Sequence, residues 1–406
     1  MKRRSQQLSK MTPRRLYEWA HSPLFQNDTA AMHSQICLFL ARETPLRMKT
    51  LSLSLAPLQG LLFPSCSSPL RIAIEHLEST YNSVSRDYSA CLDSRTLLLP
   101  SSAEKDFHQL VQRTARDIEN GIDAMVGNLK AELAPAVRTE ALTHDHNYDN
   151  DAGENNPSTT SRITPVLQKC LDETYLALIE LRVLWKQYGL CHARQQQERQ
   201  TLPLSVVTRD CKLRNIVQDV IEDVQALSLE KNSLTPPIKL VMEDDQDKDL
   251  KLNYTLDYQL HYVLLELLKN AVQAHITRYA DPEEGPPILV HVSGSSSSPS
   301  SSPSSLQQKQ TTKEHNGQQQ LGVKISDRGE GMSYPHCKHH IFRYFYSTTK
   351  EREATYTYGP GFGVPFSGIG VGMPLARLHA RWLGGLVEVS SLPGHGADAY
   401  LHLFQQ

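Results

Sequence analysis

Two polar residues that could do chemistry lie in a helix-like stretch at 258–274, beside a group of leucines. Glu266 and Asn270 are separated by one helical turn, so a helix would carry the carboxylate and the amide on the same face. Buried glutamate is rare unless it is paired. The two side chains therefore either belong to a satisfied network in the core or face a cleft, and the residues alone favour neither. Their apolar neighbours are Leu264, Leu265, Leu267 and Leu268.

An acidic residue followed by alternating glycines ends a short β-type run at 323–326. Asp327 is followed by Gly329, Gly331 and then Met332. Glycine lets the backbone approach a flat ligand closely, and a carboxylate accepts a hydrogen bond from an exocyclic amine. A tight turn capped by Asp327 explains the same residues, and for this pattern taken alone the turn is the stronger interpretation.

A second glycine-rich stretch lies near the C-terminus. Gly368, Gly370 and Gly372 precede a helical pattern at 373–383, with Pro374 suitably placed in the first turn. A glycine-rich loop that enters a helix presents backbone N–H groups and the positive end of the helix dipole to a phosphate. In a dinucleotide-binding fold such a loop follows the first strand, so the late position here argues against that fold.

The first half of the chain must supply helices. Apolar residues recur at three- and four-residue spacing over 72–133 and again over 167–188, which is typical of amphipathic helices. A further helix is expected at 13–20. The polar stretch 139–161 has almost nothing to bury and predicts a disordered insertion. We therefore expect a helical bundle domain over residues 21–200.

The second half changes class. Strands are expected at 204–207, 238–242, 288–292, 323–325, 386–390 and 399–403, with helices at 213–227, 258–274 and 373–383. This order predicts an α/β layer on one sheet over residues 201–406. The Ser-rich stretch 293–320 predicts a flexible hairpin tip. The whole chain is thus expected to be α+β, with a helical bundle before a sheet domain.

Composition narrows the function classes. The 406 residues suffice for two or three domains, and the formal net charge of -2 provides no global field for nucleic acid. No stretch is long and apolar enough to span a bilayer. Seven scattered cysteines without CxxC spacing favour a reducing compartment. The first 17 residues are basic with no acid before Glu18, so residues 1–20 are interpreted equally well as a mitochondrial presequence or as a frayed terminus.

Taken in order, the three patterns resemble the N, G1 and G2 boxes of the GHKL ATPase superfamily. That superfamily includes histidine kinases, type II topoisomerases, the ninety-kilodalton chaperones and MutL. Within it, residues 266–271, 325–329, 346–349, 372–377 and 383–385 are similar to the mitochondrial kinases of branched-chain α-ketoacid dehydrogenase and pyruvate dehydrogenase. The resemblance is specific over 204–403 and implies a Bergerat-type α/β sandwich for the second domain.

The resemblance implies a role for each matched position. Glu266 would be the general base toward a substrate serine, Asn270 would hold Mg²⁺ on ATP, and Asp327 would accept a hydrogen bond from the adenine amino group. Potassium is a further cofactor that the family suggests. The remaining implied nucleotide contacts are Gly329, Gly331, Met332, Ser347, Thr348, Thr349, Gly368, Ile369, Gly370, Val371 and Gly372.

Two positions depart from the family pattern. The family usually has a threonine that helps to bind adenine where this chain has Ala397, which puts the strength of adenine binding in doubt. Pyruvate-type relatives carry a histidine four residues before the base, whereas this chain has Tyr262 there and His261 one residue away. The second departure favours the branched-chain type.

The implied function is an ATP-dependent protein serine kinase of the mitochondrial matrix, which phosphorylates and thereby inhibits an α-ketoacid dehydrogenase complex, branched-chain favoured over pyruvate. The implied partners are the dehydrogenase component, the lipoyl-bearing acyltransferase core and a second copy of the chain in a homodimer. Nucleic acid and a membrane span are not expected. Topoisomerase and MutL functions would require a further domain after the ATPase module.

Two alternative functions stay open. A histidine autokinase would need a phosphoacceptor, for which His108 is a remote candidate. A non-catalytic, nucleotide-gated scaffold is supported by Ala397 and the long insertions, whereas the intact pair of Glu266 and Asn270 argues against it.

Overall fold

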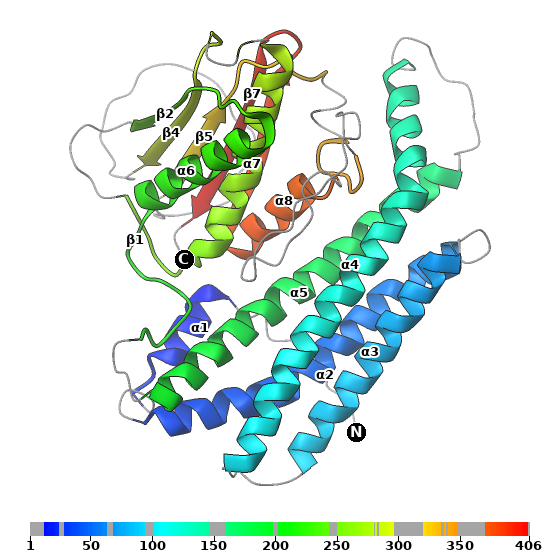
Figure 1. Ribbon diagram of the computed structural model, residues 1–406, viewed down its shortest axis with the longest axis vertical. Coiled ribbons are helices and arrows are strands. Elements are labelled where there is room, and N and C mark those ends of the chain that lie inside the picture. The colour runs from blue at the N-terminus through cyan, green and yellow to red at the C-terminus, as the bar shows by residue number, and fades with distance from the viewer. Residues whose placement is uncertain are drawn as a thin grey trace, which may run out of the picture. The chain divides into compact units, whose positions relative to one another are not determined.

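The protein divides into a helical unit and a unit built on a β-sheet. The computed structural model describes residues 12–23, 28–62, 68–93, 101–146, 159–197, 202–242, 250–279, 281, 284–295, 320–333, 337, 340–346 and 370–404. The first compact unit comprises residues 1–206 and 339–378, and the second comprises residues 207–338 and 379–406. The expected α+β class is confirmed, with the helices first and the sheet second (Figure 1).

Among the described residues, five helices form the N-terminal part of the first unit. Helix α2 packs against α3 and α5, and α4 packs against both α3 and α5. The predicted helix at 13–20 is confirmed as α1, where Thr12 Oγ1 accepts from the Arg15 amide at 3.3 Å and Pro13 occupies the first turn. The bounds are α1 Pro13–Ala20, α2 Thr29–Leu62, α3 Ser68–Asp93, α4 Ser101–His146 and α5 Thr159–Gln197.

Helices α2 and α5 share a buried charge in addition to their apolar contacts. The guanidinium of Arg47 on α2 pairs with Glu180 on α5 and lies 3.5 Å from Glu43 on its own helix. Further along α2, Ser54 Oγ lies 3.0 Å from Thr174 Oγ1 of α5. A buried charge is tolerated only when it is paired, so Arg47 fixes the register between these two helices.

The predicted disordered insertion at 139–161 is wrong at both ends. Helix α4 continues to His146, and α5 already begins at Thr159. Residues 139–146 contain no proline or glycine, and extending an existing helix is far easier than starting one, so polarity alone does not end α4. The central part, 147–158, lies outside the described residues.

Three imidazoles meet where α2, α4 and α5 pack together. The rings of His108 and His192 stack with centroids 4.1 Å apart, and His192 Nδ1 lies 3.4 Å from His33 Nε2. Tyr188 and Cys37 contact the same group, through His108 and His33 respectively. His33 is only 3% exposed. Its burial, and then the charges of His192 and His108, lower the pKa of His33 from 6.5 to about 4.

This histidine should make the fold sensitive to acid. In the unfolded chain His33 binds a proton near pH 6.5 but in the folded protein only near pH 4, so acidification through this range favours unfolding. Between pH 7 and pH 5 we expect His33 to cost about 2 kcal/mol of stability. Urea unfolding at both pH values should show a smaller pH dependence for His33→Gln than for the parent. His76→Gln, at an exposed position on α3, is the control, and an unchanged pH dependence in His33→Gln would contradict the assignment.

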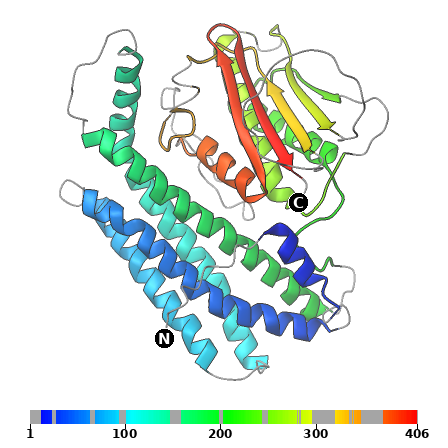
Figure 2. The same ribbon diagram turned by 180° about the vertical axis from the view of Figure 1, so that it is seen from behind.

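The second unit is built on a five-stranded mixed sheet. The strand order is β2-β4-β5-β7-β6, with β2 and β4 parallel and every other neighbouring pair antiparallel. Helix α7 forms the crossover between the two parallel strands, and α6 packs beside it on one face of the sheet (Figures 1 and 2). The bounds are β2 Ile238–Met242, β4 Ile288–Ser295, β5 Gln320–Ser326, β6 Gly385–Leu392, β7 Gly396–Phe404, α6 Leu213–Asn232 and α7 Asp257–Arg278.

The expected strand at 204–207 is wrong. The side chain of Gln187 on α5 bonds this segment instead, donating to the Leu204 carbonyl at 2.9 Å and accepting from the Val206 amide at 3.0 Å. Backbone groups used in this way cannot join a ladder. The first strand pairing occurs slightly later, between β1 (Cys211–Lys212) and β3 (Lys251–Leu252).

The hairpin expected around the Ser-rich stretch has well-defined ends. Strands β4 and β5 are antiparallel neighbours, and Ser295 pairs with Gln320 at the last described register position. The stretch between them, 296–319, lies outside the described residues. The glycine-rich segment leads into α8, Gly372–Trp382, and the chain ends in the β6–β7 hairpin.

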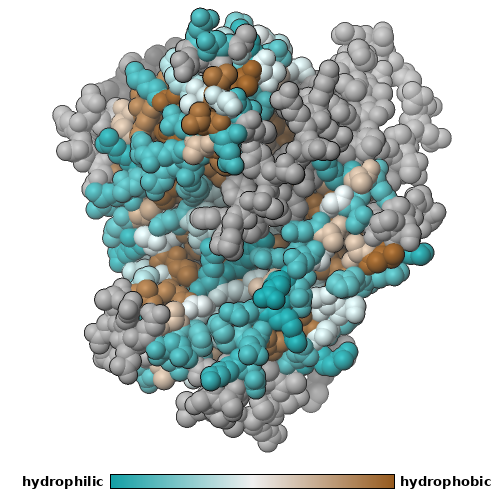
Figure 3. All heavy atoms as spheres, in the orientation of Figure 1, coloured by the Kyte–Doolittle hydropathy of each residue, from teal (hydrophilic) through white to brown (hydrophobic). Residues whose placement is uncertain are grey.

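The described cysteines are buried and much of the visible surface is hydrophilic. Among the cysteines whose side chains are described, Cys37, Cys170, Cys191, Cys211 and Cys337 are buried and form no disulfide. Burial raises the pKa of Cys191 to about 11 and that of Cys211 to about 12. Hydrophilic residues cover much of the coloured surface in Figure 3, with hydrophobic residues in separate spots. Within the described ranges, no helix combines the length and apolar character that crossing a membrane requires.

Candidate functional site

Helix α7 carries the first pair of site residues. Its inner face is apolar and packs on β4, β5 and β7, which fixes the helix against the sheet. Glu266 is 8% exposed and its Oε1 lies 2.9 Å from Lys269 Nζ, so its buried charge is paired. No described residue bonds Oε2, so this oxygen is available to accept a proton.

Asn270, one turn later on α7, has a different environment. Its side chain is exposed and makes no hydrogen bond to any described residue. An amide oxygen is a hard donor of the kind that Mg²⁺ prefers, so the residue fits a metal-binding role. The sequence left two alternatives for this pair, a satisfied network in the core or a position facing a cleft. Glu266 is paired with Lys269, as in the first alternative, whereas the Asn270 side chain is exposed.

Asp327 uses its two carboxylate oxygens differently. Oδ1 accepts from the Gly329 amide at 2.8 Å and from the Ala397 amide at 3.1 Å, which is the turn cap that the sequence favoured. Oδ2 has no hydrogen-bond partner among the described residues. The residue is 6% exposed, and burial raises the pKa of its carboxyl, while the two amide hydrogen bonds act in the opposite direction. One oxygen thus maintains the turn and the other can receive a ligand donor.

The glycines of this loop are needed for packing within the protein, because a side chain at either position would clash with neighbouring residues. A Cβ at Gly329 would lie 2.8 Å from Ala274 Cβ on α7, and Gly331 has φ +72° with the Leu392 carbonyl only 2.1 Å from a Cβ position. The next residue, Met332, donates its amide to Ser391 Oγ at 2.8 Å. The loop therefore lies directly against α7 and the β6–β7 hairpin, which brings it close to the helix that carries Glu266 and Asn270.

Arg278 is a residue that the sequence patterns did not indicate. From the last turn of α7 its Nη1 donates to the carbonyls of Arg328 at 3.0 Å, Gly329 at 2.6 Å and Gly394 at 2.9 Å. It fastens the Asp327 loop and the β6–β7 turn to the end of the same helix. A basic residue in the last turn of a helix is common for electrostatic reasons, so nothing specific in the sequence marks Arg278.

The second glycine-rich box belongs to the first unit. Gly370 has φ +75°, and its carbonyl accepts from the Phe345 amide at 2.9 Å. Val371 is buried, and its carbonyl accepts from the Leu375 amide at 3.1 Å in the first turn of α8. Gly372 begins that helix. The other predicted contacts of this part, Ser347, Thr348, Thr349, Gly368 and Ile369, lie outside the described residues.

The second unit thus assembles a carboxylate, an exposed amide and an acidic loop around one helix. Residues 256–406 match the model of the family described as histidine kinase-, DNA gyrase B-, and HSP90-like ATPases. These residues form a GHKL ATPase domain. The resemblance found in the three boxes is confirmed for this part of the chain.

Several curated relatives of this chain are named as mitochondrial kinases. The chain is 26% identical over 240 residues to pyruvate dehydrogenase (acetyl-transferring) kinase isozyme 1 of Rattus norvegicus, covering 58% of this chain and 49% of the relative. It is 28% identical over 239 residues to isozyme 4 of Homo sapiens, covering 58% and 51%. With the kinase of Schizosaccharomyces pombe the identity is 24% over 366 residues, covering 85% and 76%. The match spans about half the length of the first two relatives.

One departure from the family pattern is Tyr262, which stands where pyruvate-type relatives carry a histidine, with His261 one residue away. His261 faces α6, where its Nε2 lies 2.9 Å from Asp223 Oδ2. Tyr262, one turn before Glu266, has its ring 4.8 Å from that of His379. His261 therefore contacts α6 through Asp223, whereas Tyr262 contacts His379.

Proposed function

We propose that this protein is an ATP-dependent protein serine kinase acting on a mitochondrial α-ketoacid dehydrogenase complex. The observation that carries the proposal is the set of three side chains on and beside α7. Glu266 is a buried carboxylate with one oxygen that bonds no described residue, and Asn270 is an exposed amide. Asp327, in the adjacent loop, has a second carboxylate oxygen without a described partner. The names of the relatives support the substrate class.

In the proposed reaction Glu266 Oε2 takes the proton of the substrate serine hydroxyl. The serine oxygen forms a bond to the γ-phosphorus, the bond between that phosphorus and the β,γ-bridging oxygen breaks, and ADP leaves with the electron pair. Lys269 keeps the Glu266 side chain in position through its contact with Oε1. Asn270 would hold Mg²⁺, which neutralises charge on the phosphates when bound. Asp327 Oδ2 would select adenine through its amino group.

Further contacts of the nucleotide are proposed from the boxes. Gly329, Gly331 and Met332 would line the base, and Gly368, Ile369, Gly370, Val371 and Gly372 would face the phosphates with the hydroxyls of residues 347–349. Potassium would be an additional cofactor. The amide and the carbonyl of Ala397 are both hydrogen-bonded to Asp327. A threonine at this position would therefore carry its hydroxyl beside the proposed adenine acceptor, and the alanine has none.

The substrate, partners and location complete the proposal. Tyr262 favours a branched-chain complex, whereas the relatives compared above are named for pyruvate dehydrogenase. The protein would act as a homodimer on the acyltransferase core, in the mitochondrial matrix. The targeting signal would lie within the basic residues 1–20.

A transfer assay tests the proposal. Purified protein, Mg²⁺ and radiolabelled ATP should label the branched-chain dehydrogenase component on serine, with weaker labelling of the pyruvate component, and the label should survive acid. Acid-labile label on the protein itself would instead indicate a histidine autokinase. His108 is a poor acceptor for that reaction because it stacks on His192 and bonds Gln112 at 2.9 Å. Nucleotide binding without any transfer would indicate a scaffold.

A further inference from the structure

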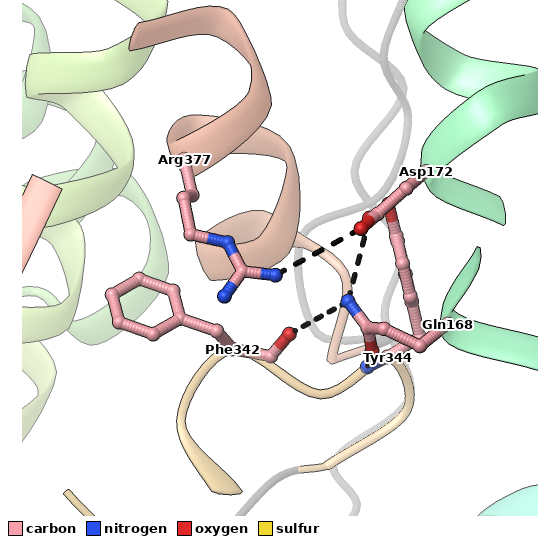
Figure 4. Close-up of polar contacts among 5 residues, drawn as sticks. All are labelled: Gln168, Asp172, Phe342, Tyr344 and Arg377. Carbon is pink, nitrogen blue, oxygen red and sulfur yellow. Dashed lines mark hydrogen bonds and ion pairs between the residues drawn. The ribbon is translucent and has the colours of Figure 1, made fainter. Parts of the chain in front are cut away.

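A polar junction joins α5 to the chain on both sides of the undescribed stretch 347–369. All of its members belong to the first unit. Figure 4 shows Gln168 and Asp172 on α5 facing the loop at 340–346 and Arg377 of α8. Neither Gln168 nor Asp172 belongs to any of the three sequence boxes.

The side-chain amide of Gln168 is hydrogen-bonded to a backbone carbonyl and a backbone amide of the loop. Its Nε2 donates to the Phe342 carbonyl at 3.1 Å and its Oε1 lies 3.4 Å from the Tyr344 amide. The same Nε2 lies 3.3 Å from Asp172 Oδ1. Because the amide donates on one side and accepts on the other, only one orientation of the side chain satisfies both loop contacts.

Asp172 links the loop to α8. Its Oδ1 accepts from the Tyr344 hydroxyl at 2.9 Å, and its Oδ2 lies 4.0 Å from Arg377 Nη2. Tyr344 is 2% exposed and its ring stacks on Tyr175 of α5. The Arg377 guanidinium also lies over the Phe342 ring, 4.8 Å from its centroid. Loop, α5 and α8 are therefore held by several interactions around one carboxylate.

The backbone at this junction is held in an uncommon conformation. Phe345 has φ +64°, which a bulky residue rarely adopts, and its amide bonds the Gly370 carbonyl. A Cβ at Gly370 would lie 2.7 Å from the Tyr346 carbonyl oxygen, so the two segments approach as closely as glycine allows. Such a conformation persists only where its surroundings enforce it, and here Gln168 and Asp172 hold the preceding loop residues Phe342 and Tyr344.

We propose that Gln168 and Asp172 are positioning residues for the phosphate-binding glycines Gly370 and Gly372. This inference rests on the proposed function, in which these glycines face the nucleotide phosphates. Gln168 and Asp172 would then affect ATP affinity through the backbone of these glycines, without a direct contact with the nucleotide. Adenine recognition is assigned to Asp327, which takes no part in the junction, so changes at the junction should leave it unaffected.

The test compares ATP with adenosine. Gln168→Met keeps the side-chain length and removes all three hydrogen bonds, and Asp172→Asn keeps the shape and removes the charge. We expect each variant to weaken ATP binding by about tenfold or more in calorimetry while adenosine binding stays at the parent value. Glu173→Gln, at an exposed neighbouring position on α5 where Glu173 pairs with Lys169, is the matched control and should bind both ligands as the parent does.

A second measurement uses the nucleotide-free protein. Amide hydrogen exchange at Phe345 and Leu375 should be faster by about tenfold in Gln168→Met, with exchange in the middle of α5 unchanged. Unchanged exchange together with an unchanged ratio of ATP to adenosine affinity would overturn the positioning role. A parent that binds ATP and labels no dehydrogenase would refute the kinase proposal alone, and a parent that binds no ATP would refute both.

Discussion

Replacement of Glu266 by glutamine should preserve ATP binding and slow transfer to a serine substrate by roughly 10²- to 10⁴-fold. The amide keeps the size of the carboxylate and cannot take the serine proton. Its oxygen can still accept from Lys269, so the local contact at Oε1 survives. Single-turnover transfer measured at saturating ATP isolates the chemical step from binding.

Two further variants make this result specific. Glu222→Gln changes an exposed glutamate on α6 and should transfer phosphate at the parent rate. Asn270→Ala should lose magnesium-dependent ATP binding, so it fails at an earlier step than Glu266→Gln. Turnover of Glu266→Gln equal to that of the parent would show that another group accepts the proton.

Asp327→Asn should separate base selectivity from folding. The amide oxygen can replace Oδ1 as acceptor for the Gly329 and Ala397 amides, so the melting temperature should stay near that of the parent. The NH₂ group then stands where Oδ2 accepted, and two donors face each other when adenine binds. Because a hydrogen bond to a charged acceptor contributes about 1.5 to 3 kcal/mol, ATP affinity should fall by about tenfold or more.

Inosine triphosphate provides the reciprocal measurement, since its base has a carbonyl in place of the adenine amino group. The parent should prefer ATP, and Asp327→Asn should lose or invert this preference. Asp219→Asn, at an exposed position on α6, is the control. Asp327→Ala should also destabilise the apo protein, because two buried amides lose their acceptor. A parent that binds both nucleotides equally would leave Asp327 as a turn cap only.

The sequence was most informative where a local signal and a tertiary requirement coincide. Helix α1 follows from Thr12 and Pro13, and strand β2 matches its expected range 238–242 because an apolar run is bounded by prolines and polar residues. The three boxes identified the ATPase domain because each contains residues whose chemistry is constrained at fixed spacing. Their roles in binding and transfer stay predictions.

The missed features depend on partners that are distant in sequence. The segment 204–207 looks like a strand until Gln187 occupies its backbone groups. Arg278 holds three carbonyls of loops that are 50 or more residues away. Gln168 and Asp172 have no distinctive neighbours in the sequence, and only the packing of the loop 340–346 on α5 brings them together with Tyr344.

The buried cysteines provide the protein with its own chemical probes of opening. Alkylating reagents attack the thiolate. Burial covers all five sulfurs and also raises the pKa of Cys191, Cys211 and Cys337, so modification should proceed only from transiently opened molecules. Cys37, Cys170 and Cys191 belong to the helical unit, whereas Cys211 and Cys337 belong to the sheet unit. Labelling kinetics followed by peptide mass spectrometry would therefore report the opening of each unit separately in the unmodified chain.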